Sequence, residues 1–125
     1  MNKTDILIIE DDENISDMYR TALEIAGLSV SVANNAKEGI DKALSEHPKV
    51  ILMDIMLPDM KGHEAVEKIK LDDWGKNVKV IFLTNMIDAE NVSKAVSLGS
   101  EEYIVKVHTT PKEVVNIVRT AMFTD

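Results

Sequence analysis

The sequence contains no cysteine, so the chain can form no disulfide bond, carries no thiol nucleophile and has no cysteine-based zinc site. It also lacks long hydrophobic runs: its longest apolar stretches have the length of a strand and are too short for a transmembrane helix. Residues 1–5 lack the basic and apolar regions of a signal peptide. Together these absences predict a cytoplasmic protein without a membrane segment.

Basic residues are the scarcer kind of charge: 14 of them stand against 22 acidic residues, which gives a net charge of −8. This charge opposes direct binding to nucleic acid or to anionic lipid, and it favours a cationic ligand or a protein partner. With 125 residues, of which 45% are hydrophobic, the chain has the size and composition of one globular domain. We therefore expect a single domain over residues 1–125, with nothing remaining to form an output domain.

Five apolar segments have the length and composition of strands. The central one lies in the stretch 50–57, which opens with β-branched residues, and Asp54, the only polar residue of this stretch, ends the strand. A run without polar alternation is typical of a strand that helices bury on both faces. The other predicted strands cover residues 5–9, 28–33, 78–84 and 103–105.

Helical spacing of apolar residues predicts a helix after each strand, with capping residues at the expected boundaries. The predicted N-terminal caps are Asn14, Asn35 with Glu38 as a capping box, Asp88, and Thr110 with Pro111 and Glu113; the predicted stops are Gly27, Pro48 and Gly99. Trp74, in the connection 71–77, is expected to cover an edge of the core. Five strands alternating with five helices predict an α/β fold, a flavodoxin-like doubly wound five-stranded parallel sheet with strand order 2-1-3-4-5.

Polar residues stand where four of the predicted strands end: Glu10 and Asp11, Asp54, Thr84, and Lys106. In such a sheet the carboxyl ends of these strands lie along one edge, so the side chains should converge. Each residue alone could be an ordinary strand end or a solvated helix start. Carboxylates held close together repel one another unless a cation is present, and a hard divalent ion such as Mg²⁺ suits oxygen ligands. Their joint placement predicts a magnesium and phosphate site.

The spacing of these residues is distinctive, with 43 residues from Asp11 to Asp54, 30 from Asp54 to Thr84 and 22 from Thr84 to Lys106. Together with the strings Ile-Ile-Glu-Asp-Asp-Glu-Asn-Ile, Met-Asp-Ile-Met-Leu-Pro-Asp-Met and Glu-Tyr-Ile-Val-Lys, this chain resembles the receiver domain of two-component response regulators. The resemblance covers nearly the whole chain. It implies a switch in which Asp54 accepts a phosphoryl group from a phosphohistidine of a sensor histidine kinase or a histidine phosphotransfer protein.

The resemblance also implies the roles of the surrounding residues. Asp11 and Asp54 would bind Mg²⁺ directly, the main-chain carbonyl of Met56 would be a further ligand, and Glu10 would act through water. Thr84 and Lys106 would contact the phosphoryl oxygens, and Tyr103 would change rotamer with phosphorylation. Apart from self-phosphorylation and slow self-dephosphorylation, both dependent on Mg²⁺, no enzyme activity is expected.

Further expectations concern partners. A downstream protein target would bind the surface formed by the helix at 88–99, the strand at 103–105 and the last helix, and the chain would be a monomer or a phosphorylation-dependent dimer. Kinase docking at the start of the first helix would leave Ile15 partly exposed.

The family usually has a cis proline after the lysine, whereas this chain has Val107, and a cis bond to a residue other than proline costs about 3 kcal/mol. We therefore expect a trans Lys106–Val107 bond.

Three other functions compete with the receiver. A haloacid-dehalogenase-like phosphatase also uses an aspartate with Mg²⁺, but it needs a second aspartate two residues later, where this chain has Met56. A flavodoxin-type cofactor carrier would need hydroxyl and glycine residues after the first strand, where this chain is acidic. A receiver fold that serves only as a phosphorylation-independent docking module stays open.

Overall fold

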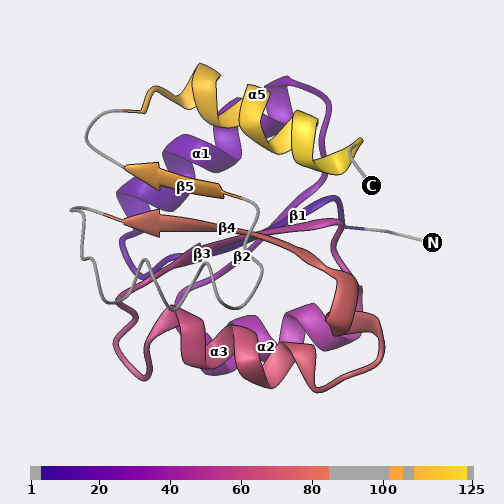
Figure 1. Cartoon of the computed structure of the whole chain (residues 1–125). Helices are drawn as coiled ribbons and strands as arrows, with labels where there is room; N and C mark the ends of the chain where they lie inside the picture. The colour runs from indigo at the N-terminus through magenta and orange to yellow at the C-terminus, as the bar shows by residue number, and fades with distance from the viewer. Residues whose placement is uncertain (1–3, 85–101, 106–108, 124–125) are drawn as a thin grey trace.

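The apolar segments of the sequence form one parallel sheet, which the computed structural model describes over residues 4–84, 102–105 and 109–123. The strands are β1 (Ile6–Ile9), β2 (Val30–Ala33), β3 (Val50–Asp54), β4 (Lys79–Thr84) and β5 (Glu102–Val105). Every neighbouring pair is parallel, and the strand order is β2-β1-β3-β4-β5 (Figure 1). The predicted flavodoxin-like sheet order is therefore confirmed.

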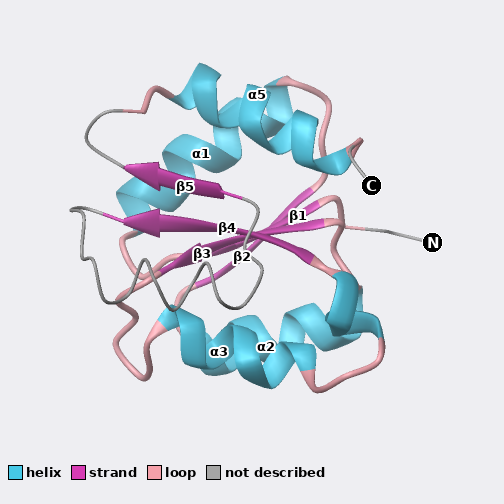
Figure 2. Cartoon of the chain, in the orientation of Figure 1, coloured by secondary structure: helices cyan, strands magenta, loops and turns pink. Residues whose placement is uncertain are grey.

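Helices cover both faces of this sheet. Helices α1 (Glu13–Ile25) and α5 (Pro111–Met122) lie on one face, and α2 (Ala36–Glu46) and α3 (Gly62–Lys70) lie on the other (Figure 2). A short 3-10 helix, η1 (Trp74–Asn77), leads from α3 into β4. The predicted helix between Asp88 and Gly99 lies outside the described residues. None of the described helices is long and apolar enough to cross a membrane.

The two central strands explain the absence of polar alternation in the sequence. All side chains of β1 and β3 are buried, because successive residues point to opposite faces and each face has its own core. Ile8 and Leu52 pack in the cluster beneath α1 and α5, whereas Ile9 and Met53 pack in the cluster beneath α2 and α3. The core therefore fixes the ends of β1 and β3, which carry the candidate site.

The helix boundaries confirm two predicted caps and correct one. Thr110 and Glu113 form the complete capping box that opens α5, and Asn35 accepts a hydrogen bond from the amide of Glu38. The prediction that Asn14 caps α1 is wrong: Asp12 is the cap, and its Oδ1 accepts from the amides of Asn14 and Ile15. A carboxylate is favoured over an amide at this position by the partial positive charge of the helix start.

Gly27 and Trp74 also lie as predicted. Gly27 follows α1 with a φ of 90°, a conformation that side chains disfavour. Trp74 is partly buried against the core beneath α2 and α3, and its ring stacks on that of His47 with centroids 4.6 Å apart. His47 itself ends α2 in the left-handed conformation, one residue before Pro48.

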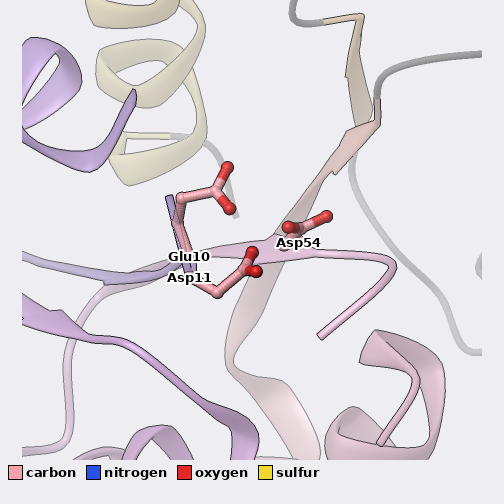
Figure 3. A group of neighbouring side chains, drawn as sticks. All are labelled: Glu10, Asp11 and Asp54. Atoms are coloured by element: carbon pink, nitrogen blue, oxygen red, sulfur yellow. The ribbon is translucent and has the colours of Figure 1, made fainter. Parts of the chain in front are cut away.

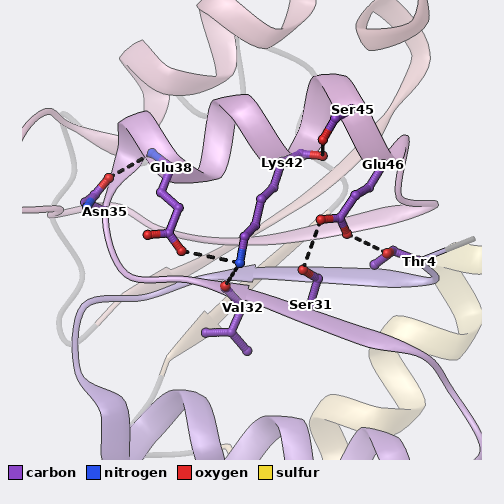
Figure 4. Close-up of polar contacts among 8 residues, drawn as sticks. All are labelled: Thr4, Ser31, Val32, Asn35, Glu38, Lys42, Ser45 and Glu46. Atoms are coloured by element: carbon purple, nitrogen blue, oxygen red, sulfur yellow. Dashed lines mark hydrogen bonds and ion pairs between the residues drawn. The ribbon is translucent and has the colours of Figure 1, made fainter. Parts of the chain in front are cut away.

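Strand β2 forms one edge of the sheet, and side chains of α2 reach across it (Figure 4). The Nζ of Lys42 donates a hydrogen bond to the main-chain carbonyl of Val32 and lies 3.3 Å from a carboxylate oxygen of Glu38. One turn later, the carboxylate of Glu46 accepts hydrogen bonds from the hydroxyls of Ser31 and Thr4. Polar groups of α2 therefore fasten the helix to the edge strand.

Candidate acidic metal and phosphoryl site

Three carboxylates gather at the carboxyl ends of β1 and β3. Because Ile9 is paired with Met53, Glu10 and Asp54 follow side by side on adjacent strands. One carboxylate oxygen from each of Glu10, Asp11 and Asp54 lies within 4.8 Å of the others (Figure 3). Glu10 is fully buried, Asp54 is 6% exposed and Asp11 is exposed. The cluster thus joins two covered acids to one that faces solvent.

The backbone around Glu10 explains why the acidic run turns toward this site. The amide of Glu10 donates to the carbonyl of Ala33 and so extends the pairing of β1 with β2 by one residue. The carboxylate of Glu10 then accepts from the amide of Asp12, at 3.3 Å, and Asp12 caps α1. Asp11 is therefore held between the last strand pair and the first turn of a helix.

The segment after Asp54 folds back on the end of β3. The amide of Met56 donates to Oδ1 of Asp54 at 3.2 Å, and Met56 forms an isolated antiparallel bridge with Lys61. The amide of Gly62 donates to the carbonyl of Ile55 at 2.7 Å. A short closed loop, residues 55–62, therefore fixes the main chain of Met56 next to Asp54, while the Met56 side chain is exposed.

The remaining predicted site residues are described only in part. In the sheet, Asp54 is paired with Leu83 and Thr84 with Val105, so the backbones of Asp54 and Thr84 reach the same edge. Tyr103, in β5, is paired with Phe82 of β4. Lys106 and the Lys106–Val107 bond lie outside the described residues. The proposed side-chain roles of Thr84, Tyr103 and Lys106 stay predictions.

The chemistry of the donors fits a hard divalent cation. All three side chains offer carboxylate oxygen, the ligand type that Mg²⁺ prefers, and no nitrogen or sulfur donor of the described residues belongs to the group. Three negative charges within a few ångströms repel one another, so a bound cation would stabilise the arrangement. Glu10, Asp11, Asp54 and the main-chain carbonyl of Met56 are the groups that could hold it.

Two residues that bear on the geometry of the site, Asp59 and Gly62, were not singled out from the sequence. Gly62 approaches the backbone of Asp54 closely, and Asp59 hydrogen-bonds to the start of α2. The glycine in a sequence turn indicates a bend but not which atom it meets, and the partners of Asp59 lie more than 20 residues earlier in the chain.

Ile15 is partly buried against the core beneath α1 and α5, which confirms its predicted partial exposure, while kinase docking there stays a prediction.

Comparison with known proteins identifies the family. The family model of the response regulator receiver domain matches residues 6–119. An uncharacterized 14.6 kDa protein in the sodA1 3' region of Leptolyngbya boryana is 32% identical, with 92% of this chain and 87% of that protein covered. A probable transcriptional regulator, ycf27, of Porphyridium aerugineum is 30% identical; the alignment covers 98% of this chain but only 49% of that protein. This chain therefore spans about half the length of that regulator.

Comparison of this fold with solved structures identifies the same family. A solved CheY-like response regulator receiver domain protein from Methanospirillum hungatei JF-1 is 31% identical and superposes with a TM-score of 0.87, covering 97% of this chain and 94% of that one. The predicted resemblance to receiver domains is thus confirmed by the family match over residues 6–119 and by the similarity of the fold. This chain belongs to the response regulator receiver domain family, whose members are phosphoryl-accepting signalling domains and not classical enzymes.

Proposed function

We propose that Asp54 receives a phosphoryl group from a phosphohistidine of a sensor histidine kinase or a histidine phosphotransfer protein, in a reaction that requires Mg²⁺. The observation that carries this proposal is the approach of the Glu10, Asp11 and Asp54 carboxylates to within 4.8 Å at the end of the central strands. Asp54 is the acid placed on the rigid strand itself, where a nucleophile can be held in one geometry. We expect the whole chain to act as one domain.

Phosphoryl transfer depends on positioning and on neutralising the oxygens of the transferred group more than on a general base. When bound, Mg²⁺ would supply positive charge to those oxygens. Asp11 and Asp54 would hold it directly, together with the main-chain carbonyl of Met56, and Glu10 would act through water. Thr84, the last residue of β4, and Lys106, which follows β5 in the sequence, would donate to the phosphoryl oxygens.

Phosphorylation would be read out on the surface of the segment 88–99, β5 and α5, because Thr84 and Tyr103 lie on the strands at its base. On α5, Lys112 and Asn116 are exposed, as expected for a docking surface. Arg119 is exposed too, but its guanidinium donates to the carbonyl of Ala26 at 2.7 Å and so also joins α5 to α1. The net charge of −8 favours a protein target over nucleic acid. We expect the chain to be a monomer or a phosphorylation-dependent dimer.

Intact mass measurement tests the proposal. The protein is incubated with Mg²⁺ and a small acyl phosphate or phosphoramidate donor, with a chelator in a parallel sample. We expect a gain of one phosphoryl group that is lost in the chelated sample and in Asp54→Asn. Full labelling of Asp54→Asn would show that another residue is the acceptor.

The same experiment separates the competing functions. Continuous release of phosphate from the donor, in place of stoichiometric labelling, would indicate a phosphatase. No labelling with any donor or with a cognate kinase would indicate a docking module that works without phosphorylation.

A further inference from the structure

Asp59 joins the loop that follows the phosphoacceptor to a different helix. It lies in the middle of the loop 55–62, and its two carboxylate oxygens accept from the amides of Ala36 and Lys37 at 2.8 and 2.9 Å. These are the first two residues of α2, whose amides have no acceptor within the helix. Asn35 satisfies the amide of Glu38 separately. The start of α2 is therefore capped by two segments, of which one is the loop beside Asp54.

The charge of Asp59 strengthens this contact. Burial raises the pKa of its carboxyl group, but backbone hydrogen bonds, first those from the Ala36 and Lys37 amides, together hold the pKa below its usual value of 3.8. The group is thus ionised at neutral pH, and hydrogen bonds to an ionised acceptor are stronger than those between neutral groups. The positive end of the α2 dipole adds to the attraction.

The position of Asp59 gives the contact a consequence for the site. At one end of the loop, the amide of Met56 donates to Asp54; at the other, the amide of Gly62 donates to the carbonyl of Ile55. These bonds close the loop on itself and on β3. Asp59 ties it to the neighbouring helix, so the place of the Met56 main chain depends on α2 as well as on β3.

We propose that Asp59 is a positioning residue, which holds the loop 55–62 against α2 so that the main-chain carbonyl of Met56 is kept in place for the divalent cation. The inference rests on the proposed function, in which Glu10, Asp11, Asp54 and Met56 form the cation site. Asp59 does not itself contact the cation. Removing its carboxylate lowers the affinity for Mg²⁺ through the loop.

The chain offers a matched control for this effect. Asn35→Ala removes a cap from the same helix end without touching the loop, whereas Asp59→Ala removes the caps that come from the loop. Mg²⁺ affinity is measured by calorimetry on the parent and on both variants, with circular dichroism to confirm that each is folded. We expect both variants to melt at a lower temperature, but only Asp59→Ala to bind Mg²⁺ more weakly, by about tenfold as for other residues that support metal ligands.

Two further variants make the outcomes distinct. Asp11→Ala should lose Mg²⁺ binding if the acidic cluster is the cation site, and Asp59→Asn, which keeps one acceptor oxygen, should fall between the parent and Asp59→Ala. If Asp11→Ala loses binding while Asp59→Ala binds as tightly as Asn35→Ala, the positioning role is wrong and the cation site stands. If Asp11→Ala binds Mg²⁺ like the parent, the proposed cation site itself is wrong.

Should Asp59→Ala not fold, Asp59→Asn decides the question, with amide chemical shifts as the second measurement. The positioning role predicts that Asp59→Asn shifts the amides of Asp54 and Met56, whereas Asn35→Ala leaves them in place. Unchanged amides in a folded Asp59→Asn, with unchanged Mg²⁺ affinity, would overturn it.

Discussion

A Cβ atom on residue 62 would lie 2.3 Å from the main-chain carbonyl oxygen of Asp54, so Gly62 is required by the space available there. Its second and third neighbours would be Ile55 Cα and the Met53 side chain, both at 3.1 Å. Backbone atoms of a buried strand cannot move aside as a flexible side chain can. The close approach therefore couples the start of α3 to the end of β3.

Gly62→Ala should force the loop away from β3. We expect a loss of about 1–3 kcal/mol in the free energy of unfolding, the usual cost of overpacking, together with weaker Mg²⁺ binding because the Met56 main chain moves. Urea unfolding and calorimetric titration measure the two effects.

Gly27→Ala is the control for Gly62→Ala. Gly27 has a φ of 90°, and a Cβ atom added to it would meet no atom within 4 Å, so alanine there costs about 1–2 kcal/mol through backbone strain alone. Its Mg²⁺ affinity should equal that of the parent. Equal affinity in both glycine variants would show that Gly62 serves stability only.

Lys79→Met should raise the free energy of unfolding by about 1 kcal/mol or more. The Nζ of Lys79 is covered and has no hydrogen-bond partner among the residues that the structure describes. A buried ammonium without a partner has lost its hydration, whereas methionine has a similar length and no charge. Thermal and urea unfolding measure the change.

Lys76→Met serves as the matched control, because Lys76 is exposed and forms only a surface ion pair with Asp73 at 3.1 Å among the described residues. Its stability should change by no more than about 0.5 kcal/mol. A Lys79→Met variant less stable than the parent would mean that the ammonium has a stabilising partner in solution.

Asp5→Asn should lower stability at neutral pH by about 1 kcal/mol, and the difference from the parent should vanish in acid. Burial raises the pKa of Asp5, but hydrogen bonds from Ser29 and the charge of Lys49, 3.4 Å away, bring it below 3.8. A lowered pKa means that the carboxylate contributes stability above the unfolded value and loses it as pH falls through the folded value. Urea unfolding from about pH 7 down to about pH 2 measures this.

Asp17→Asn is the comparison for Asp5→Asn, since the described contact of the Asp17 side chain is an exposed ion pair with Arg20 at 3.2 Å. We expect a change of at most about 0.5 kcal/mol at either end of the pH range. If the Asp5→Asn difference persists undiminished in acid, its origin is packing and not ionisation.

Much of this arrangement follows from local sequence. The uninterrupted apolar runs of β1 and β3 predict burial on both faces, and parallel strands bring their carboxyl ends to one edge, so Glu10, Asp11 and Asp54 could be placed together before their distances were known. The cap of α1 could not be chosen in the same way, because Asp12 and Asn14 are both good caps and lie close together in the sequence.

Contacts between distant segments could not be predicted. The sequence around Asp59 is typical of a turn and does not indicate what Asp59 contacts. Its partners Ala36 and Lys37 lie 23 and 22 residues earlier, and they come near it only when α2 and α3 pack side by side. The contact of Gly62 could not be predicted for the same reason. The sequence shows the glycine, but it does not show that the carbonyl of Asp54 lies too close to allow a side chain there.

The fastening of α2 to β2 bears on how molecules of this protein meet one another. The outer edge of a sheet presents main-chain groups that can pair with a strand of another molecule, which is a route to aggregation. Along β2, the Nζ of Lys42 donates to the carbonyl of Val32, and the Glu46 carboxylate accepts from the hydroxyl of Ser31. A strand that approached this edge would have to displace the charged Lys42 side chain before it could pair with the carbonyl of Val32. The contact that holds α2 in place therefore also occupies a main-chain acceptor at the edge of the sheet.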